Sequence, residues 1–167
     1  MGASMSQDKM FDNYALLKSQ YKDFVDVEPQ PDYDMISEHI QLVNPFEVEY
    51  KLKASYQIYK GVQSNTPMVK HQDGRPSKYF FITLLDKEND PGSYIHVGVA
   101  QKYANIDRDN DGVETSYLMS CYSGTVVNFG KVKAYLNRKY PSTVPPGSVI
   151  ITLLDMDEGT LSYIING

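Results

Sequence analysis

Apolar residues near the start of the chain recur with the spacing of an α-helix. Over residues 6–27, "SQDKMFDNYALLKSQYKDFVDV", they stand at intervals of 4, 3, 4 and 3, which places them on one helical face. The pattern predicts an amphipathic helix over 6–27. Its apolar face is expected to pack on the rest of the domain or, alternatively, to bind a partner. The residues of this face are Met10, Tyr14, Leu17, Tyr21 and Phe24.

The next segment has the composition of an extended connection. Residues 28–34, "EPQPDYD", contain two prolines and three acids. Proline lacks the backbone N–H that a helix interior needs, so the helix is expected to end there. We expect an extended linker over 28–44.

From residue 45 onward the pattern is that of β-strands. "FEVEYKLKASYQIYKG" alternates apolar and polar residues, so Val48 and Tyr50 are expected on one face of a strand. "KYFFITLLD", "SYIHVGVA" and "SVIITLLD" are more continuously apolar, which is typical of central strands in a sandwich. The chain is therefore predicted to be all-β: an antiparallel β-sandwich over 45–167 with an N-terminal α-helix.

One short sequence occurs twice. "ITLLD" stands at 82–86 and again at 151–155, and each copy is followed by an acidic turn with a glycine and then by "SYI". Each copy predicts a β-hairpin. The turn carboxylates are expected to be solvated, because acid–base catalysis needs a cleft that shifts their pKa values.

Composition limits the classes of partner. The chain has 167 residues, which suits one domain, and a net charge of −5 without a cluster of Lys or Arg. Nucleic acid and membrane are therefore not expected as partners. Residues 1–5 are expected to be a tag remnant or disordered, although Gly2 and Ser6 also fit an acylation signal.

The distribution of reactive residues argues against catalysis. The three histidines are dispersed, and none stands at metal-ligand spacing from another His or from the cysteine. The single cysteine, Cys121, excludes an internal disulfide and fits a reducing compartment, so a cytoplasmic or nuclear location is expected. In "MSCYSG" it is predicted to be a buried thiol. No cofactor is expected.

"DRDNDGVETSYL", residues 107–118, begins like a calcium-binding EF-hand loop. Asp107, Asp109 and Asp111 alternate and a glycine follows, but Leu118 stands where the loop needs a bidentate Glu. The flanking sequences also have strand patterns instead of helical ones. We expect an acidic loop between two strands and no metal; a weak cation site on the three aspartates is the alternative.

The C-terminal region resembles a known family. "VPPGSVIITLLDMDEGTLSYIING", residues 144–167, resembles the hallmark of SPRY (B30.2-type) domains, in which a proline and glycine precede a strand, an acidic turn, a second strand and "NG". "KYFFITLLDKENDPGSYIHVGVAQ" is similar to an earlier part of that family, in the form of Ran-binding-protein-like or ryanodine-receptor-like members. The matching residues are Pro146, Gly147, Val149, Ile150, Asp155, Gly159, Thr160, Leu161, Ser162, Asn166 and Gly167, with Tyr79, Phe80, Val97, Gly98, Val99 and Ala100.

The resemblance covers residues 45–167 and implies a SPRY sandwich of concanavalin-like jelly-roll architecture, with two departures. The chain has no Trp, and Tyr94 and Tyr163 are expected to supply the missing bulk. It also stops before the family's last strands, which would leave an open sheet edge. Residues 10–45, or a second molecule in a homodimer through the 10–24 helix or the open edge, are the candidates to cover it.

SPRY domains are non-catalytic modules of larger eukaryotic assemblies such as ubiquitin ligases, where they recognise peptides or proteins through loops at one end. The resemblance therefore implies a module with a protein or peptide partner, and the candidate loops are 62–77, 102–116 and 129–146. A lectin-like or calcium-assisted ligand-binding sandwich is the alternative. The candidate contact residues are Gln63, Asn65, Thr66, Tyr103, Asn105, Asp107, Asp109, Asn110, Asp111, Tyr135 and Tyr140.

Overall fold

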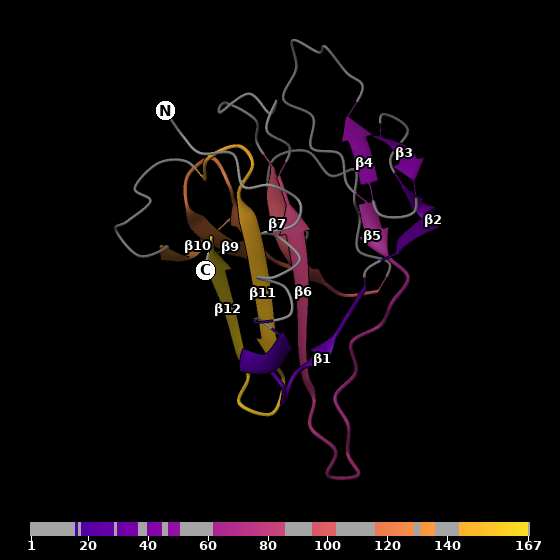
Figure 1. Ribbon diagram of the computed structural model, residues 1–167, viewed down its shortest axis with the longest axis vertical. Coiled ribbons are helices and arrows are strands. Elements are labelled where there is room, and N and C mark those ends of the chain that lie inside the picture. Colours follow the sequence, from indigo (N-terminus) through magenta and orange to yellow (C-terminus); the bar gives the residue numbers. More distant parts are fainter. Residues whose placement is uncertain are drawn as a thin grey trace.

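The regular structure of the described chain consists of strands, apart from one short helical stretch (Figure 1). The computed structural model describes residues 16, 18–28, 30–36, 40–44, 47–50, 62–85, 95–102, 116–128, 131–135 and 144–166. The protein is therefore all-β, as predicted. The strands are β1 (Val25–Asp26), β2 (Pro31–Ile36), β3 (Ile40–Asn44), β4 (Glu47–Tyr50), β5 (Val62–Ser64), β6 (Lys78–Leu84), β7 (His96–Ala100), β8 (Ser116–Ser120), β9 (Thr125–Asn128), β10 (Lys131–Tyr135), β11 (Val149–Asp155) and β12 (Thr160–Ile165).

Two four-stranded sheets form the body of the described chain. The strand order is β1-β6-β11-β12 in the first sheet and β10-β9-β8-β7 in the second. All neighbours are antiparallel except β1 and β6, which are parallel, so the first sheet is mixed. The pairs β2–β5 and β3–β4 form two small ribbons beside these sheets (Figure 1).

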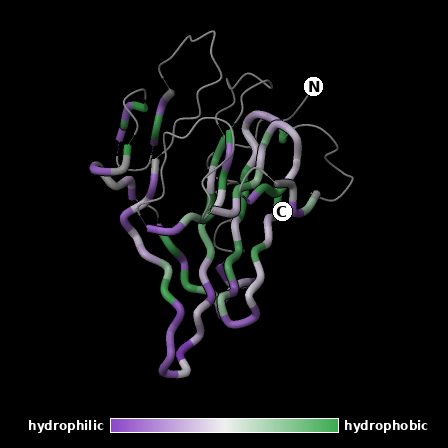
Figure 2. Tube along the Cα trace, turned by 180° about the vertical axis from the view of Figure 1, so that it is seen from behind, coloured by the Kyte–Doolittle hydropathy of each residue, from purple (hydrophilic) through white to green (hydrophobic). Residues whose placement is uncertain are grey.

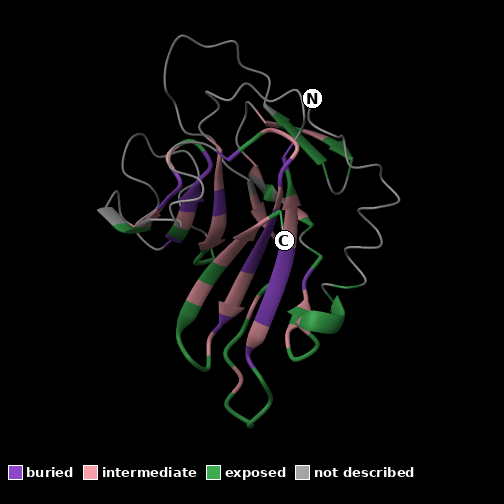
Figure 3. Cartoon of the chain, turned by 60° about the vertical axis from the view of Figure 1, so that its left-hand side comes forward, coloured by how far each residue is buried: buried purple, intermediate pink, exposed green. Residues whose placement is uncertain are grey.

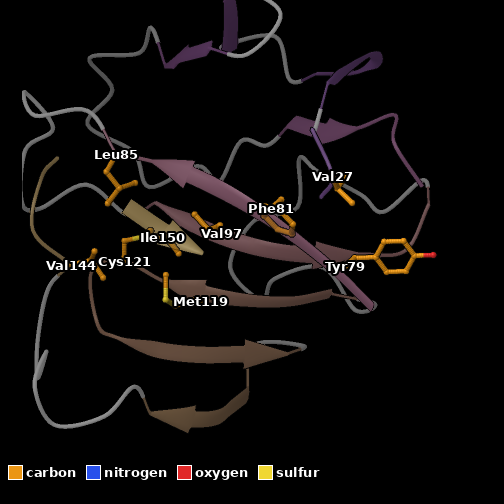
Figure 4. Close-up of a cluster of buried hydrophobic side chains, with 9 residues drawn as sticks. All are labelled: Val27, Tyr79, Phe81, Leu85, Val97, Met119, Cys121, Val144 and Ile150. Carbon is orange, nitrogen blue, oxygen red and sulfur yellow. The ribbon is translucent and has the colours of Figure 1, made fainter. Parts of the chain in front are cut away.

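Apolar side chains from both larger sheets share one core (Figure 4). Phe81 and Ile150 from the first sheet pack with Val97 and Met119 from the second. Met119 and Ile150 have an exposed fraction of 0%. Hydrophobic residues follow the central strands while the turns are hydrophilic (Figure 2). Because one core joins the two sheets, the arrangement is sandwich-like.

β11 is buried on both faces, as its continuous apolar pattern predicts. Ile150 and Thr152 face the shared core and Ile151 faces the opposite side, because side chains alternate along a strand; none of the three is more than 1% exposed. Buried residues gather in β11 and in its neighbour β6 (Figure 3). On the outer side, the ring of Tyr21 lies 6.4 Å from that of Phe80. Tyr21, one residue of the predicted apolar face, therefore packs on the domain, but it lies in a turn and not in a helix.

The predicted helix over 6–27 extends too far at its C-terminal end. Residues 16 and 18–20 are helical, but residues 21–24 form turns and β1 begins at Val25. Val25 and Val27 are β-branched and favour extended backbone. The amide of Val27 donates to the Phe80 carbonyl at 2.8 Å, so pairing with β6 outweighs the helical spacing. Residues 6–15 and 17 lie outside the described chain.

The predicted linker over 28–44 contains two strands instead. β2 pairs with β5 and β3 pairs with β4. Pro31 is the first residue of β2, a position where the missing N–H costs no ladder bond. Val48 is 44% exposed, because β4 pairs in a two-stranded ribbon outside the larger sheets.

The two "ITLLD" copies differ in their surroundings. The second forms the predicted hairpin, because β11 pairs with β12 across the turn 156–159. The hairpin predicted for the first copy is wrong, because β6 and β7 belong to different sheets. Instead the two copies pair with each other, with Ile82 opposite Ile151. A strand that is apolar on both faces favours a central position with a strand on each side.

Gly98 lies where another backbone approaches closely, as a glycine inside a strand predicts. A Cβ there would lie 2.1 Å from the Tyr117 carbonyl oxygen and 2.8 Å from the Tyr163 hydroxyl. That hydroxyl donates to the Tyr117 carbonyl at 3.3 Å, and burial raises the pKa of Tyr163. Tyr163 therefore packs against the core as expected for a Trp substitute, while Tyr94 lies outside the described residues.

Replacing Gly98 tests this approach. We expect Gly98→Ala to lower the free energy of unfolding by about 3 kcal/mol, because the new methyl group meets backbone that cannot move aside. Gly74→Ala is the control, since nothing lies within 4 Å of a Cβ there; only its positive φ of 82° adds strain, about 1 kcal/mol. Urea unfolding followed by circular dichroism measures both. Equal losses would contradict the close approach.

Candidate interaction surface

The directions of the strands gather several loops at one end of the sandwich, here named the loop end. β6 begins there, β11 ends there, and β7 ends there. Tyr79 and Val27 lie toward this end of the core, while Leu85, Cys121 and Val144 lie toward the other (Figure 4). The predicted contact residues Gln63, Asn65 and Thr66 lie at the beginning of loop 62–77, which leads into β6 at this end.

Gln63 joins two of the predicted contact loops. Its Nε2 donates to the carbonyl of Gln101 at 2.7 Å. Gln101 directly follows β7 and precedes the predicted loop 102–116. Loops 62–77 and 102–116 therefore start side by side.

Asn65 and Thr66 attach the first loop to the segment after β1. The amide of Asn65 donates to the Gln30 carbonyl at 2.9 Å, and the Thr66 hydroxyl donates to the Glu28 carbonyl at 3.4 Å. The Ser64 hydroxyl accepts from the amide of Thr66 at 3.1 Å. These contacts make the three predicted residues anchors of the loop as well as candidates for partner contact.

The side chain of Tyr79 forms hydrogen bonds with the middle of the same loop. It is 6% exposed, and its hydroxyl donates to the Val69 carbonyl at 2.7 Å and accepts from the Val69 amide at 3.3 Å. The Nε2 of His71 lies 3.2 Å from this hydroxyl. Because the hydroxyl has one proton, which the Val69 carbonyl accepts, His71 acts as the donor in this contact.

Ser77 fastens the loop to the turn between β11 and β12. Its exposed fraction is 0%, and its hydroxyl accepts from the His71 amide at 2.8 Å. Its amide donates to Asp157 Oδ2 at 2.9 Å, and its carbonyl accepts from the Met156 amide at 2.9 Å. Lys70 Nζ also donates to the Met156 carbonyl at 2.8 Å. The loop 65–77 and the turn 156–159 thus form one unit.

Asp155 organises this turn. Its Oδ1 accepts from the amides of Asp157 and Glu158, each at 3.0 Å. Its Oδ2 lies 2.8 Å from Lys78 Nζ. The bond from Lys78, followed by the one from the Glu158 amide, lowers the pKa of Asp155, and Asp155 in turn raises the pKa of Lys78. The carboxylate therefore stays ionised at neutral pH and holds the turn, which does not suit it to proton transfer.

The unit displays a mixed surface to solvent. Val69 is an apolar side chain that is 53% exposed. Arg75 Nε pairs with Asp73 Oδ2 at 2.8 Å, and both side chains are exposed. The amide of Arg75 is the main cause that lowers the pKa of Asp73. An exposed apolar group and a pair of opposite charges on one loop suit a protein surface as a partner.

The structure does not bring the third predicted loop to the loop end as a whole. Tyr135, at the end of β10, pairs with Thr125, which lies at the opposite end. The amide of Val144 donates to the carbonyl of Cys121, also at the opposite end. Tyr135 is therefore separated from Gln63 by the length of the sheet. The remaining candidates lie outside the described residues: Tyr103, Asn105, Asp107, Asp109, Asn110, Asp111 and Tyr140.

Cys121 is a buried thiol, as predicted. It is 4% exposed, and burial raises its pKa to about 12. The thiol is therefore protonated at neutral pH and is not a nucleophile in the folded state.

The described part of the chain contains neither a cluster suited to bind a metal ion nor a helix suited to cross a membrane. No group of three or more His, Cys, Asp or Glu side chains there is placed to hold a metal ion. The aspartates of residues 107–111 are not in that part, so the calcium alternative stays a prediction. Within the same ranges, no helix combines the length and the apolar character that a bilayer crossing requires.

Sequence reasoning missed the residues that hold the loop end together. Ser77 precedes a strand, and nothing in its spacing indicates that it binds a turn some 80 residues later. Nor does the position of Tyr79 in that strand indicate that its hydroxyl binds the backbone of Val69. Asp155 had a visible signal, because a carboxylate followed by polar residues and a glycine is typical of a side chain that caps its own turn. The sequence "DMDEG" carries that pattern.

No family model, curated protein or solved structure matches this chain. The resemblance of residues 144–167 to SPRY domains therefore stays a prediction from the motif.

The pairing of Asp155 with Lys78 predicts a pH dependence. Because the folded-state pKa of Asp155 is below its ordinary value of 3.8, its contribution to stability is present above that value and is lost as pH falls through the folded pKa. Asp155→Asn keeps Oδ1 as an acceptor for the turn but removes the charge. We expect the wild type to unfold at a higher temperature than Asp155→Asn at pH 7, and the difference to shrink toward pH 2.

Thermal unfolding followed by circular dichroism at pH 7, 4 and 2 measures this difference. The control is Asp73→Asn, whose exposed partner Arg75 gives a pair of little consequence for stability. A difference for Asp155→Asn that persists unchanged to pH 2 would contradict the role of the charge.

Proposed function

We propose that the chain is a non-catalytic protein-interaction module that binds a protein or peptide partner through the loop end. The observation that carries this proposal is the fastening of loop 65–77 to turn 156–159 by Ser77 and Lys70. A loop fixed in this way loses little conformational entropy on binding, so contacts to it translate more fully into affinity.

The exposed side chains of this loop supply contacts of the usual kind. Val69 offers apolar area, and Arg75 offers a planar cation, a residue type enriched among binding hot spots. Gln63 ties the beginning of loop 62–77 to Gln101, the residue before loop 102–116. Tyr103 and the acidic residues 107–111, which follow Gln101 in the sequence, are further candidates for partner contact in this proposal.

The SPRY motif supports the same proposal. Gly147 and Gly159 have φ values of 75° and 68°, the conformation for which a turn needs glycine. Asn166 Oδ1 accepts from the Val149 amide at 3.0 Å, and its Nδ2 donates to Ser148 Oγ at 3.2 Å. The two ends of the motif thus meet, and Gly147, Gly159 and Asn166 each have a structural reason. We extend the proposal to a targeting or substrate-recognition role inside the cell, as in SPRY-containing ubiquitin ligases.

The described chemistry favours binding over catalysis. Asp155 is held ionised by Lys78, and Cys121 is held protonated by burial. Neither group is available to move a proton or to attack a substrate at neutral pH.

A charge placed on the loop tests the proposal. We expect Val69→Asp to lower the yield of the partners that bind the immobilised protein from a cell extract by about tenfold, because the new charge must be desolvated at the interface. Leu84→Asp is a matched control: Leu84 is also 53% exposed but lies at the opposite end of β6. Quantitative mass spectrometry of the bound fraction measures the ratio.

The proposal is wrong if the Val69→Asp variant retains the same partners as the wild type. It is equally wrong if both variants lose them together, since the contact would then not depend on the loop end. Circular dichroism melts of each variant verify that the fold is intact.

A further inference from the structure

β12 is the last strand of its sheet. The order β1-β6-β11-β12 gives it β11 as a neighbour on one side, and in the described part of the chain no strand pairs with its other side. The pairing with β11 runs over six residue pairs, from Asp155 opposite Thr160 to Ile150 opposite Ile165, without a register shift. β12 is therefore a regular edge strand.

The hydrogen-bond pattern shows which residues face outward. The Asn166 amide donates to the Val149 carbonyl at 2.9 Å, so this pair is a hydrogen-bonded one. Because such pairs alternate in an antiparallel ladder, Ile164, Ser162 and Thr160 also bond to β11. Leu161, Tyr163 and Ile165 therefore direct their N–H and C=O groups away from β11, toward the edge with which no described strand pairs.

The bonds on the other side of β11 agree with this alternation. The Leu85 amide donates to the Ser148 carbonyl, and the Met156 amide donates to the Ser77 carbonyl. Even-numbered residues of β11 thus bond to β6, and odd-numbered residues are left to bond to β12.

The sequence of β12 lacks the usual protection of an edge. Soluble proteins block such edges with lysine, proline, bulges or inward-pointing charges. "TLSYII" contains no charged residue and no proline, and its ladder contains no bulge. The outer edge offers three consecutive outward-facing residues, each with one donor and one acceptor.

We propose that the outer edge of β12 is a second binding site, separate from the loop end, which takes an extended segment of a partner protein as an added strand. The added strand pairs with the outward groups of Leu161, Tyr163 and Ile165. This is the strand-addition mode of peptide recognition, in which main-chain bonds give affinity. Binding at this site does not require the loop end, and either proposal can be correct without the other.

The size of the edge favours a peptide segment over a second copy of the chain. A stable dimer buries at least about 1,000 Å² in total, which a ladder of six residues does not supply. A linear segment of about five residues can bind through the main-chain hydrogen bonds of such a ladder alone.

Charge at one end of β12 defines the segment further. The turn before Thr160 carries three carboxylates, Asp155, Asp157 and Glu158, while Lys70 and Lys78 are the amines bonded to it. One negative charge is left over. An antiparallel strand, the more stable orientation, places its C-terminal end beside this turn. The fitting segment is uncharged and β-branched, with Lys or Arg after it.

The test uses fluorescein-labelled TVTVTKK as the probe, with TVTVTEE and TVPVTKK for comparison, in fluorescence anisotropy titrations of the full chain. We expect TVTVTKK to bind about fivefold more tightly than TVTVTEE, because a basic end meets the acidic turn. Glu158→Gln is expected to reduce this preference toward one. TVPVTKK is expected to bind about tenfold more weakly, because proline removes a ladder donor.

Two variants of the protein separate the main-chain bonds from the side chain. Leu161→Pro removes an outward N–H, whereas Leu161→Ala removes the same side chain and keeps the N–H. We expect about tenfold weaker binding in the first relative to the second. If Leu161→Pro does not fold, hydrogen exchange of the wild type replaces it: the probe should slow exchange at the Leu161, Tyr163 and Ile165 amides.

The proposal is overturned if the probe does not bind, if Leu161→Pro binds as well as Leu161→Ala, or if the three amides exchange at unchanged rates. It is also overturned if light scattering gives twice the 18.9 kDa chain mass and Leu161→Pro returns it to one, because a second copy would then occupy the edge. Val69→Asp, the loop-end variant, should leave probe binding unchanged. The failure of one proposal can therefore be distinguished from the failure of the other.

Discussion

The antiparallel ladder between β6 and β11 is the interaction on which the rest of the described structure depends. It pairs seven residues on each strand, from Val149 opposite Leu84 to Asp155 opposite Lys78. Both strands are buried on both faces at their centres, so the ladder supplies the shared core on one side and a second apolar layer, with Phe80 and Ile151, on the other. Because neighbouring strands can shift only if seven pairs shift together, the ladder also sets the position of everything attached to its two ends.

The loop end is the direct product of that ladder. The register continues beyond Asp155 and Lys78, so that Met156 lies opposite Ser77. From there on, hydrogen bonds between the loop and the turn replace those of the ladder. The ion pair of Lys78 and Asp155 closes the ladder, and the same carboxylate caps the turn. A surface for partner contact thus rests on the most regular part of the fold, which is the arrangement that keeps a binding loop in one conformation.

The sequence predicted the features that depend on local pattern. The continuous apolar runs of β6 and β11, the hairpin of β11 with β12, the close approach at Gly98 and the buried thiol at Cys121 all follow from residue type and spacing, and the structure confirms them. What failed depends on distant partners. The helical spacing of Tyr21 and Phe24 was overridden where β6 offered Val25 and Val27 an edge to pair with. The sequence predicts separate hairpins for the two "ITLLD" copies, because the residues of one strand do not indicate which strand pairs with it. In the candidate site, the structure brings Gln63, Asn65 and Thr66 together. Tyr135, which the sequence predicts in the same site, lies a strand's length away from that end.

The single cysteine gives the protein a built-in reporter of its own stability. Cys121 is the only thiol in the chain, it is packed among Val144, Met119 and Ile150 in the shared core, and its thiolate is scarcely populated while it stays there. A thiol-specific reagent reacts with it only when the sheets part, so the rate of labelling under native conditions measures how often the core opens. The labelling rate of Cys121 can therefore be measured in every surface variant without adding a probe. A thiol introduced on an exposed loop would react much faster and could be distinguished from it.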